Sequence, residues 1–148
     1  MPSAVTDPFD LRRFVDAQQP LYAQVTAELA AGAKTSHWMW FIFPQLKALG
    51  RSGTAQRYGI VSLGEAQAYA QHPLLGARLR ECCGHLMAVQ GRSALQVFGT
   101  IDTLKLRSCL TLFERAAPHE PLFGRLLDKF YSGERDAATL ALLRDGAA

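Results

Sequence analysis

Residues 36–45 read Ser-His-Trp-Met-Trp-Phe-Ile-Phe-Pro-Gln, and their centre, residues 38–43, is the longest apolar run of the chain. This run is apolar on every side, so periodicity alone fits either a buried helix or a buried strand. Pro44 disfavours helical geometry at Phe43 and ends the element there. Because helical segments flank the run on both sides, a strand would have no partner. We therefore predict a short buried helix, with Trp40 in the core.

Helix-starting and helix-ending residues are frequent on both sides of this stretch. Capping side chains, prolines at first helical positions and a glycine at position 32, where a helix would end, all follow the usual rules. Ser62 and Glu65 have the spacing of a capping box. We expect an all-α fold, a compact single domain over residues 1–148 with about nine short-to-medium helices. Besides the aromatic helix, the predicted starts are Asp7-Pro8, Pro20, Thr54, Ser62, Pro73, Ser93, Asp102, Pro121 and Asp136.

The composition is that of a globular protein. Of 148 residues, 49% are apolar and 20% are charged, which excludes a disordered or collagen-like chain. No apolar run reaches the ~20 residues of a membrane span, and the N-terminus lacks the pattern of a signal peptide. The three cysteines have no disulfide or zinc spacing, and we expect them to be buried free thiols. These features predict a cytoplasmic protein.

Standard catalytic signatures are missing from the sequence. The chain has no glycine-rich phosphate loop and no metalloprotease or serine hydrolase motif. Its four histidines lack ligand spacing, so neither a metal nor another cofactor is expected.

Residues 29–64 form a basic-aromatic interval, because no Asp or Glu lies between Glu28 and Glu65. The interval contains four Lys or Arg residues and both tryptophans. The net charge of +3 is nevertheless too small to predict nucleic-acid binding.

A first candidate site lies at the start of this interval. We expect Lys34, His37, Trp38 and Gln45 to line a pocket in which an aromatic face stacks on a flat heterocycle and cations meet an anion. The alternative interpretation is that the aromatic side chains are core, and that His37 makes a local capping bond near Ser36. The sequence does not decide between them.

A second candidate site lies at the predicted helix start at Asp102. Lys105, Ser108 and Thr111 recur at every third position and predict one polar ridge. Backbone N–H groups at a helix start favour an anion, to which Lys105 and Arg107 would add charge. The alternative is a solvated helix face that Asp102 caps. The candidate ligand-binding residues are Lys34, His37, Trp38, Gln45, Asp102, Lys105, Arg107 and Ser108.

The predicted helix that follows Pro73 contains a glycine and two arginines. We expect Gly76 to permit a close crossing of two helices. Arg78 and Arg80 are predicted to be solvated or paired with local acids such as Glu81.

Five segments of this sequence carry a family resemblance. They are DPFDLRRFVDAQ at 7–18, SHWMWFIFPQL at 36–46, YGI at 58–60, HPLLGARLREC at 72–82 and LKLRSCLTLF at 104–113. With them the chain resembles the bacterial domain-of-unknown-function 1810 family, which implies a small, helical, cytoplasmic protein. The family motif more usually reads LKLRSSMTLF, so Cys109 and Leu110 depart from it. Members are often labelled calpastatin, a disordered protease inhibitor, which we interpret as a misannotation.

The order of Lys105, Phe113 and Gly133 is also similar to the carboxy-terminal half of the NADAR superfamily. That similarity implies binding or hydrolysis of ADP-ribose or ribosylamine N-glycosides.

Two hypotheses about function follow. In the first, the protein binds or hydrolyses a phosphorylated nucleoside-like ligand. Trp38 would then stack, Lys34, Lys105 and Arg107 would neutralise phosphate, and Glu28 or Asp102 would orient water. In the second, the protein is a non-enzymatic helical interaction module that uses the basic-aromatic interval as its contact surface. We expect a monomer or weak dimer that binds neither membrane nor nucleic acid.

Overall fold

The computed structural model describes residues 6–146, and all its regular elements are helices apart from one lone bridge. The fold is all-α, as predicted. The helices are α1 (Arg12–Gln18), α2 (Tyr22–Ala31), α3 (Met39–Ile42), α4 (Gly53–Tyr58), α5 (Leu63–Gln71), α6 (Leu75–Ala88), α7 (Ala94–Ala116), α8 (Leu122–Tyr131) and α9 (Ala137–Arg144), with a short 3-10 turn η1 (Lys47–Leu49).

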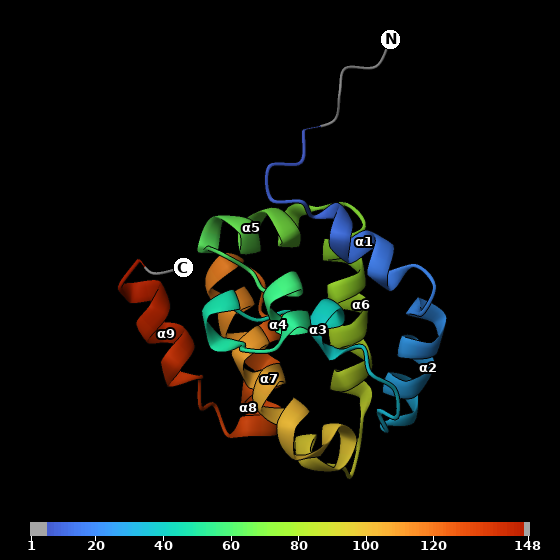
Figure 1. Ribbon diagram of the computed structural model, residues 1–148. Coiled ribbons are helices and arrows are strands. Elements are labelled where there is room, and N and C mark those ends of the chain that lie inside the picture. The colour runs from blue at the N-terminus through green and yellow to red at the C-terminus, as the bar shows by residue number, and fades with distance from the viewer. Residues whose placement is uncertain (1–5, 147–148) are drawn as a thin grey trace.

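Helices α6 and α7 form the centre of the bundle. Helix α7 packs against α5, α8 and α9, and α6 packs against α2, α5 and α8. Figure 1 shows α1 and α2 on one side of these two helices and α9 on the other. The buried apolar side chains form one cluster, to which α7 contributes Leu106, Leu110 and Phe113. Burial of this cluster is the main force that holds the short helices together.

The predicted helix ends are confirmed at several positions. Ser62, Ser93 and Asp136 each accept a hydrogen bond from a backbone N–H in the first turn of α5, α7 and α9. Gly32 ends α2 with a φ of 69°, a left-handed conformation that favours glycine. Glu65 does not complete the predicted capping box, because its carboxylate accepts a hydrogen bond from the Val61 N–H and not from that of Ser62.

Two predicted helix starts are wrong. Helix α1 begins at Arg12 and not at Pro8, because Asp10 has a φ of 52° that interrupts helical geometry. Asp7 still accepts hydrogen bonds from the N–H groups of residues 11 and 12. Helix α7 consists of two helices that meet at Gly99, whose backbone is not helical (φ 84°, ψ 174°). The short helix from Ser93 to Gly99 agrees with the sequence, but the second helix begins before Asp102, so Asp102 is not its cap.

The aromatic stretch folds as the predicted short helix, α3, which ends before Phe43. The prediction that Trp40 lies in the core is wrong, since Trp40 is partly exposed. Trp38, in contrast, is 1% exposed and belongs to the core cluster. A helix of four residues cannot bury every side, and its free side carries Trp40.

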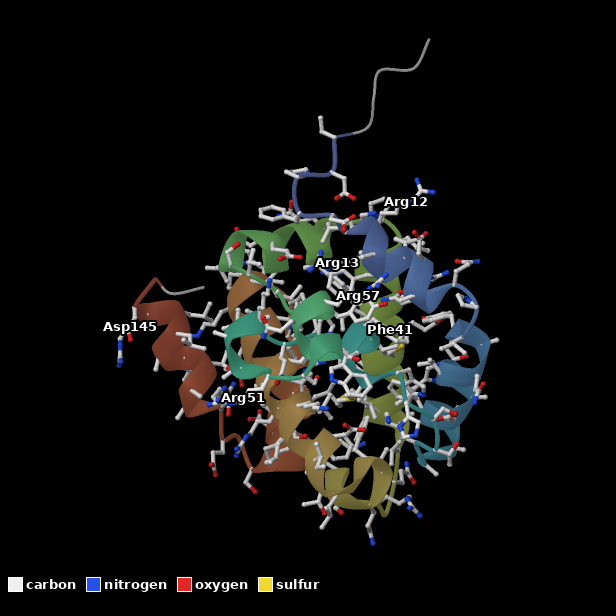
Figure 2. The ribbon with its side chains drawn as sticks, in the orientation of Figure 1. Arg12, Arg13, Phe41, Arg51, Arg57 and Asp145 are labelled. Atoms are coloured by element: carbon white, nitrogen blue, oxygen red, sulfur yellow. The ribbon has the colours of Figure 1, made fainter. Side chains whose placement is uncertain are left out.

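Arg13 joins α1 to the segment between α4 and α5. Its Nε donates to the Arg57 carbonyl at 2.8 Å, and Nη2 donates to the Gly59 carbonyl at 3.0 Å and to a Glu65 carboxylate oxygen at 2.8 Å. Figure 2 shows Arg13 and Arg57 beside each other above Phe41. This arginine therefore joins α1 to the end of α4 and to the start of α5.

The three cysteines, Cys82, Cys83 and Cys109, are buried free thiols, as expected. Burial raises the pKa of Cys82 to about 12, which keeps the thiol protonated and unreactive. Within residues 6–146 no helix has the length and apolar character needed to cross a membrane.

Candidate functional site

Glu28 on α2 organises the loop that leads into α3. Its Oε1 accepts hydrogen bonds from the Trp38 indole at 3.0 Å and from the backbone N–H groups of Thr35 at 2.8 Å and Ser36 at 3.0 Å. Its Oε2 accepts from the Ser36 hydroxyl at 2.7 Å and from Gln24 at 3.0 Å. One carboxylate thus holds five donors and fixes the position of Trp38.

These hydrogen bonds determine the charge of Glu28. Burial by itself raises the pKa of this carboxyl, but the donors from Ser36, Thr35 and Trp38 outweigh it and lower the pKa to about 2. Glu28 is therefore ionised at neutral pH, and both its oxygens are engaged. Glu28 therefore has a structural role, and it does not have the role of orienting water that the first hypothesis gave it.

Lys34, Asp102 and Lys105 form a group that we call the lysine cluster. Lys34 Nζ lies 2.8 Å from Asp102 Oδ2, and Lys105 Nζ lies 3.6 Å from Asp102 Oδ1. The Lys34 side chain is only 6% exposed, whereas those of Asp102 and Lys105 are 19% and 20% exposed. The cluster joins the loop after α2 to α7, and its formal charges leave one excess positive charge.

Each lysine of the cluster lies over one tryptophan. Lys34 Nζ is 4.9 Å from the centroid of the Trp38 ring, and Lys105 Nζ is 4.4 Å from that of Trp40. Both distances are in the range of cation–π attraction. Trp38 is covered, so of these two pairs it is Trp40 with Lys105 that combines an aromatic surface with a cation that solvent reaches.

A crevice of about 10 Å³ opens beside Trp40 and Lys105. Gln45 also lines this crevice, so two of the predicted site residues, Gln45 and Lys105, lie at the same place. The volume is enough for about one water molecule and not for a nucleotide. A ligand here would lie on the surface of the crevice, against Trp40, and not inside it. The crevice is lined by Met39, Trp40, Phe43, Gln45, Ala55, Tyr58, Gly59 and Lys105.

The structure places the other candidate residues elsewhere. Arg107 points toward the segment between α8 and α9, where it pairs with Glu134 at 3.1 Å and Asp136 at 3.9 Å. His37 is exposed and has no hydrogen bond to any side chain or backbone group within residues 6–146. Neither residue touches the lysine cluster.

The predicted polar ridge on α7 is wrong. Ser108 is buried and donates to the Leu104 carbonyl at 3.2 Å, and Thr111 is buried and donates to the Arg107 carbonyl at 2.8 Å. Both hydroxyls bond to the preceding turn of the same helix, which is how serine and threonine are commonly accommodated inside a core. Lys105 is the only residue of the three that solvent reaches.

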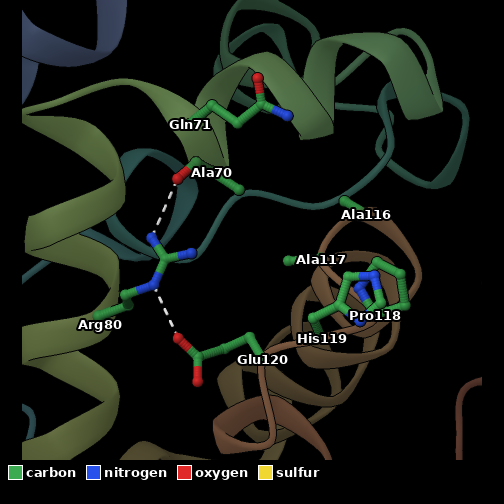
Figure 3. A pocket seen from close by; sticks show the side chains of 8 residues that line it. All are labelled: Ala70, Gln71, Arg80, Ala116, Ala117, Pro118, His119 and Glu120. Atoms are coloured by element: carbon green, nitrogen blue, oxygen red, sulfur yellow. Dashed lines mark hydrogen bonds and ion pairs between the residues drawn. The ribbon is translucent and has the colours of Figure 1, made fainter.

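Sequence reasoning missed a larger pocket at Arg80, with a volume of about 470 Å³ (Figure 3). Arg80 does not pair with Glu81 as expected, because its Nε donates to Glu120 at 2.8 Å. The partner lies 40 residues further along the chain, and no local pattern indicates such a contact. Gly76, which the sequence did single out, is the one signal that pointed to this region.

Comparison with known proteins places the chain in a family. Residues 8–143 match the family described as "Protein of unknown function (DUF1810)", and the chain belongs to this family. A solved structure, of the conserved hypothetical protein Rv1873 from Mycobacterium tuberculosis, is 58% identical in sequence with a TM-score of 0.92. The match covers 93% of this chain and 99% of that one. A comparison with curated proteins found no match.

These comparisons confirm the family resemblance seen in the sequence. They do not confirm the similarity to the NADAR superfamily, and they do not bear out the calpastatin label.

Proposed function

We propose that the protein binds a phosphorylated nucleoside-like ligand, of the ADP-ribose or ribosylamine N-glycoside type, at Trp40 and the lysine cluster. The observation that carries the proposal is Lys105, a partly exposed cation 4.4 Å from the partly exposed ring of Trp40. A heterocycle would stack on the outer face of Trp40, and a phosphate would pair with the lysine. Trp40 thereby takes the role that the sequence suggested for Trp38.

Lys34 and Lys105 have different roles in this proposal. Lys34 is almost fully covered and lies close to Asp102, at 2.8 Å, so it balances the charge of that carboxylate. Lys105 lies further from Asp102, at 3.6 Å, and can turn toward an incoming phosphate. Binding would exchange a loose ion pair for a charge-assisted hydrogen bond to phosphate.

Asp102 is the carboxylate best placed for hydrolysis of an N-glycosidic bond. It is 19% exposed and lies in the cluster, whereas Glu28 is already engaged by five donors. In the proposed reaction a water oxygen bonds to the anomeric carbon as the carbon–nitrogen bond breaks. Asp102 accepts one proton of that water and passes it to the departing nitrogen, so the two products together contain the atoms of one water molecule.

A thermal-shift screen at low salt tests the proposal with ADP-ribose, NAD, ribose 5-phosphate and a phosphorylated ribosylamine. A ligand at about 100 times its Kd adds about 2.7 kcal/mol of stability. Lys105→Ala should abolish the shift and change the melting temperature of the free protein little, because the only ion pair that Lys105 makes within residues 6–146, with Asp102, is long at 3.6 Å. Arg51→Ala is the matched control, since it removes one cation from an exposed loop (Figure 2).

No shift with any of these compounds would overturn the proposal, as would a shift that Lys105→Ala leaves intact. Product analysis of a shifted sample then separates an enzyme from a sensor or carrier, because binding without turnover identifies the latter.

The alternative, a helical interaction module, is favoured by three exposed apolar side chains on the first half of α7. Leu95, Ile101 and Leu104 are 55%, 69% and 56% exposed. Exposed apolar groups that gather on one element are typical of contact surfaces. Sedimentation that shows a dimer at nanomolar concentration, lost in Ile101→Ser, would support this second function and contradict the expected monomer or weak dimer.

A further inference from the structure

The pocket at Arg80 shares no lining residue with the lysine cluster or with the crevice at Trp40, which the proposed function uses. Its walls come from the end of α5, from α6 and from the segment that joins α7 to α8 (Figure 3). The volume of about 470 Å³ is within the range of small-molecule sites. The lining residues are Ala70, Gln71, Arg80, Ala116, Ala117, Pro118, His119 and Glu120.

Arg80 is held rigidly in the wall of this pocket. Its Nη1 donates to the carbonyls of Ala70 at 2.9 Å and Gly76 at 3.1 Å, and its Nε donates to Glu120 Oε1 at 2.8 Å. Within residues 6–146, Nη2 has no hydrogen bond, and Figure 3 shows the third nitrogen of the guanidinium directed toward Ala117. The guanidinium therefore presents free N–H groups in a fixed orientation.

Gly76 is what allows this arrangement. A Cβ at position 76 would lie 2.3 Å from the Ala70 carbonyl oxygen and 2.9 Å from Arg80 Nη1. Any other residue would push α5 away from α6 and break the hydrogen bond from Arg80 to Ala70. The glycine thus serves the placement of the guanidinium as well as the helix crossing.

Glu120 supplies the complementary charge. Its Oε1 accepts from Arg80, and its Oε2 has no hydrogen bond to a group within residues 6–146. The Arg80 and Glu120 side chains are 37% and 25% exposed, so solvent reaches both. Because their charges cancel, the pair gives no net attraction to an anion or a cation alone. A ligand that carries both charges gains from both residues.

We propose that this pocket binds a zwitterionic α-amino acid. The carboxylate of the ligand accepts hydrogen bonds from Arg80 Nη2, and its ammonium group donates to Glu120 Oε2. The methyl groups of Ala70, Ala116 and Ala117 leave room for the side chain of the ligand and favour an apolar one. This site is separate from the lysine cluster, so the two proposals stand or fall independently.

Isothermal titration of the full chain with each of the twenty common amino acids tests the proposal. We expect saturable binding of at least one amino acid with a small apolar side chain. The N-acetyl derivative lacks the ammonium group and the amide lacks the carboxylate, so each should bind at least tenfold more weakly.

Two variants and a control connect such binding to the pocket. Glu120→Gln keeps an oxygen for Arg80 and removes the charge, so it should weaken binding at least tenfold. Ala117→Leu fills the pocket and should abolish binding. Glu134→Gln changes an exposed glutamate elsewhere and should bind as the parent chain does. Melting temperatures of all the variants show that they are folded.

The proposal is overturned if no amino acid binds saturably at millimolar concentration. It is equally overturned if the N-acetyl derivative binds as well as the free amino acid, or if Glu120→Gln and Ala117→Leu, both folded, bind unchanged. The last result would leave the Arg80–Glu120 ion pair as a brace between α6 and the segment before α8.

Discussion

Trp38 and Trp40 are two residues apart, yet the molecule uses them in opposite ways. Trp38 is 1% exposed and donates its indole N–H to Glu28, so it belongs to the core. Trp40 is partly exposed and lies under Lys105. The difference teaches that a buried indole needs an acceptor for its N–H. Glu28 supplies that acceptor to Trp38, which is why the ring of Trp38 is the one that turns inward. The ring of Trp40 stays partly exposed, and it is the one on which the proposed ligand would stack.

The largest expected effect is that of Trp38→Ala. We expect a loss of about 3–5 kcal/mol in the free energy of unfolding, because the substitution removes a large core side chain and leaves a cavity. The sequence predicted Trp40 in the core, whereas the structure places Trp38 there, so the large loss is expected at Trp38. Urea denaturation measures it, and an unchanged midpoint would mean that Trp38 is not core.

A smaller effect is expected when Glu28 loses its charge. Its folded pKa of about 2 is below the ordinary value of 4.5, so the unfolded chain binds the proton more readily. The stability that Glu28 contributes is therefore present above pH 4.5 and is lost as the pH falls toward 2. Glu28→Gln should cost about 2 kcal/mol at neutral pH, because the amide keeps one acceptor oxygen and the net loss is about one charge-assisted hydrogen bond, worth roughly 1.5–3 kcal/mol.

Denaturation of Glu28→Gln and of the parent chain from pH 7 to pH 2 measures this contribution. The difference between them should shrink at low pH. A difference that stays constant over this range would show that the charge of Glu28 is not what stabilises the loop.

The smallest expected effect on folding is that of Trp40→Ala. Because this ring is partly exposed, we expect a loss of about 1 kcal/mol, which is ordinary for a single substitution. The variant should nevertheless lose the ligand-induced rise in melting temperature that the proposed function predicts for the parent chain. A large loss of stability, or an undiminished shift, would contradict the division of roles between the two tryptophans.

Much of the fold could be predicted from the sequence because helix ends depend on local chemistry. Serine and aspartate cap a helix by bonding to its first N–H groups, as Ser93 and Asp136 do, and glycine ends one by adopting a left-handed conformation, as Gly32 does. Position 10 escaped prediction, because the left-handed conformation of Asp10 is set by the contacts that Asp7 makes to the next turn.

The candidate site was predicted less completely, and the reason is physical. Lys34, Trp38, Gln45, Asp102 and Lys105 do gather around α3 and the first half of α7. Which face of an entirely apolar helix turns inward depends on a partner such as Glu28, and periodicity within that helix carries no information on it. Arg80 pairs with Glu120 because segments far apart in the sequence pack together, so no spacing in the sequence predicts this ion pair.

The contacts of Glu28 also bear on the order in which the region assembles. Glu28 meets Thr35, Ser36 and Trp38 across only 7, 8 and 10 residues, so little loop entropy opposes these contacts. Lys34 and Asp102, by contrast, come from distant parts of the chain. Hydrogen exchange should therefore show the Thr35 and Ser36 amides still protected in partly open states that have lost the first half of α7. In such states Glu28 would still hold Trp38 while Lys105 moves away with α7, so binding of the proposed ligand would require α7 to be docked.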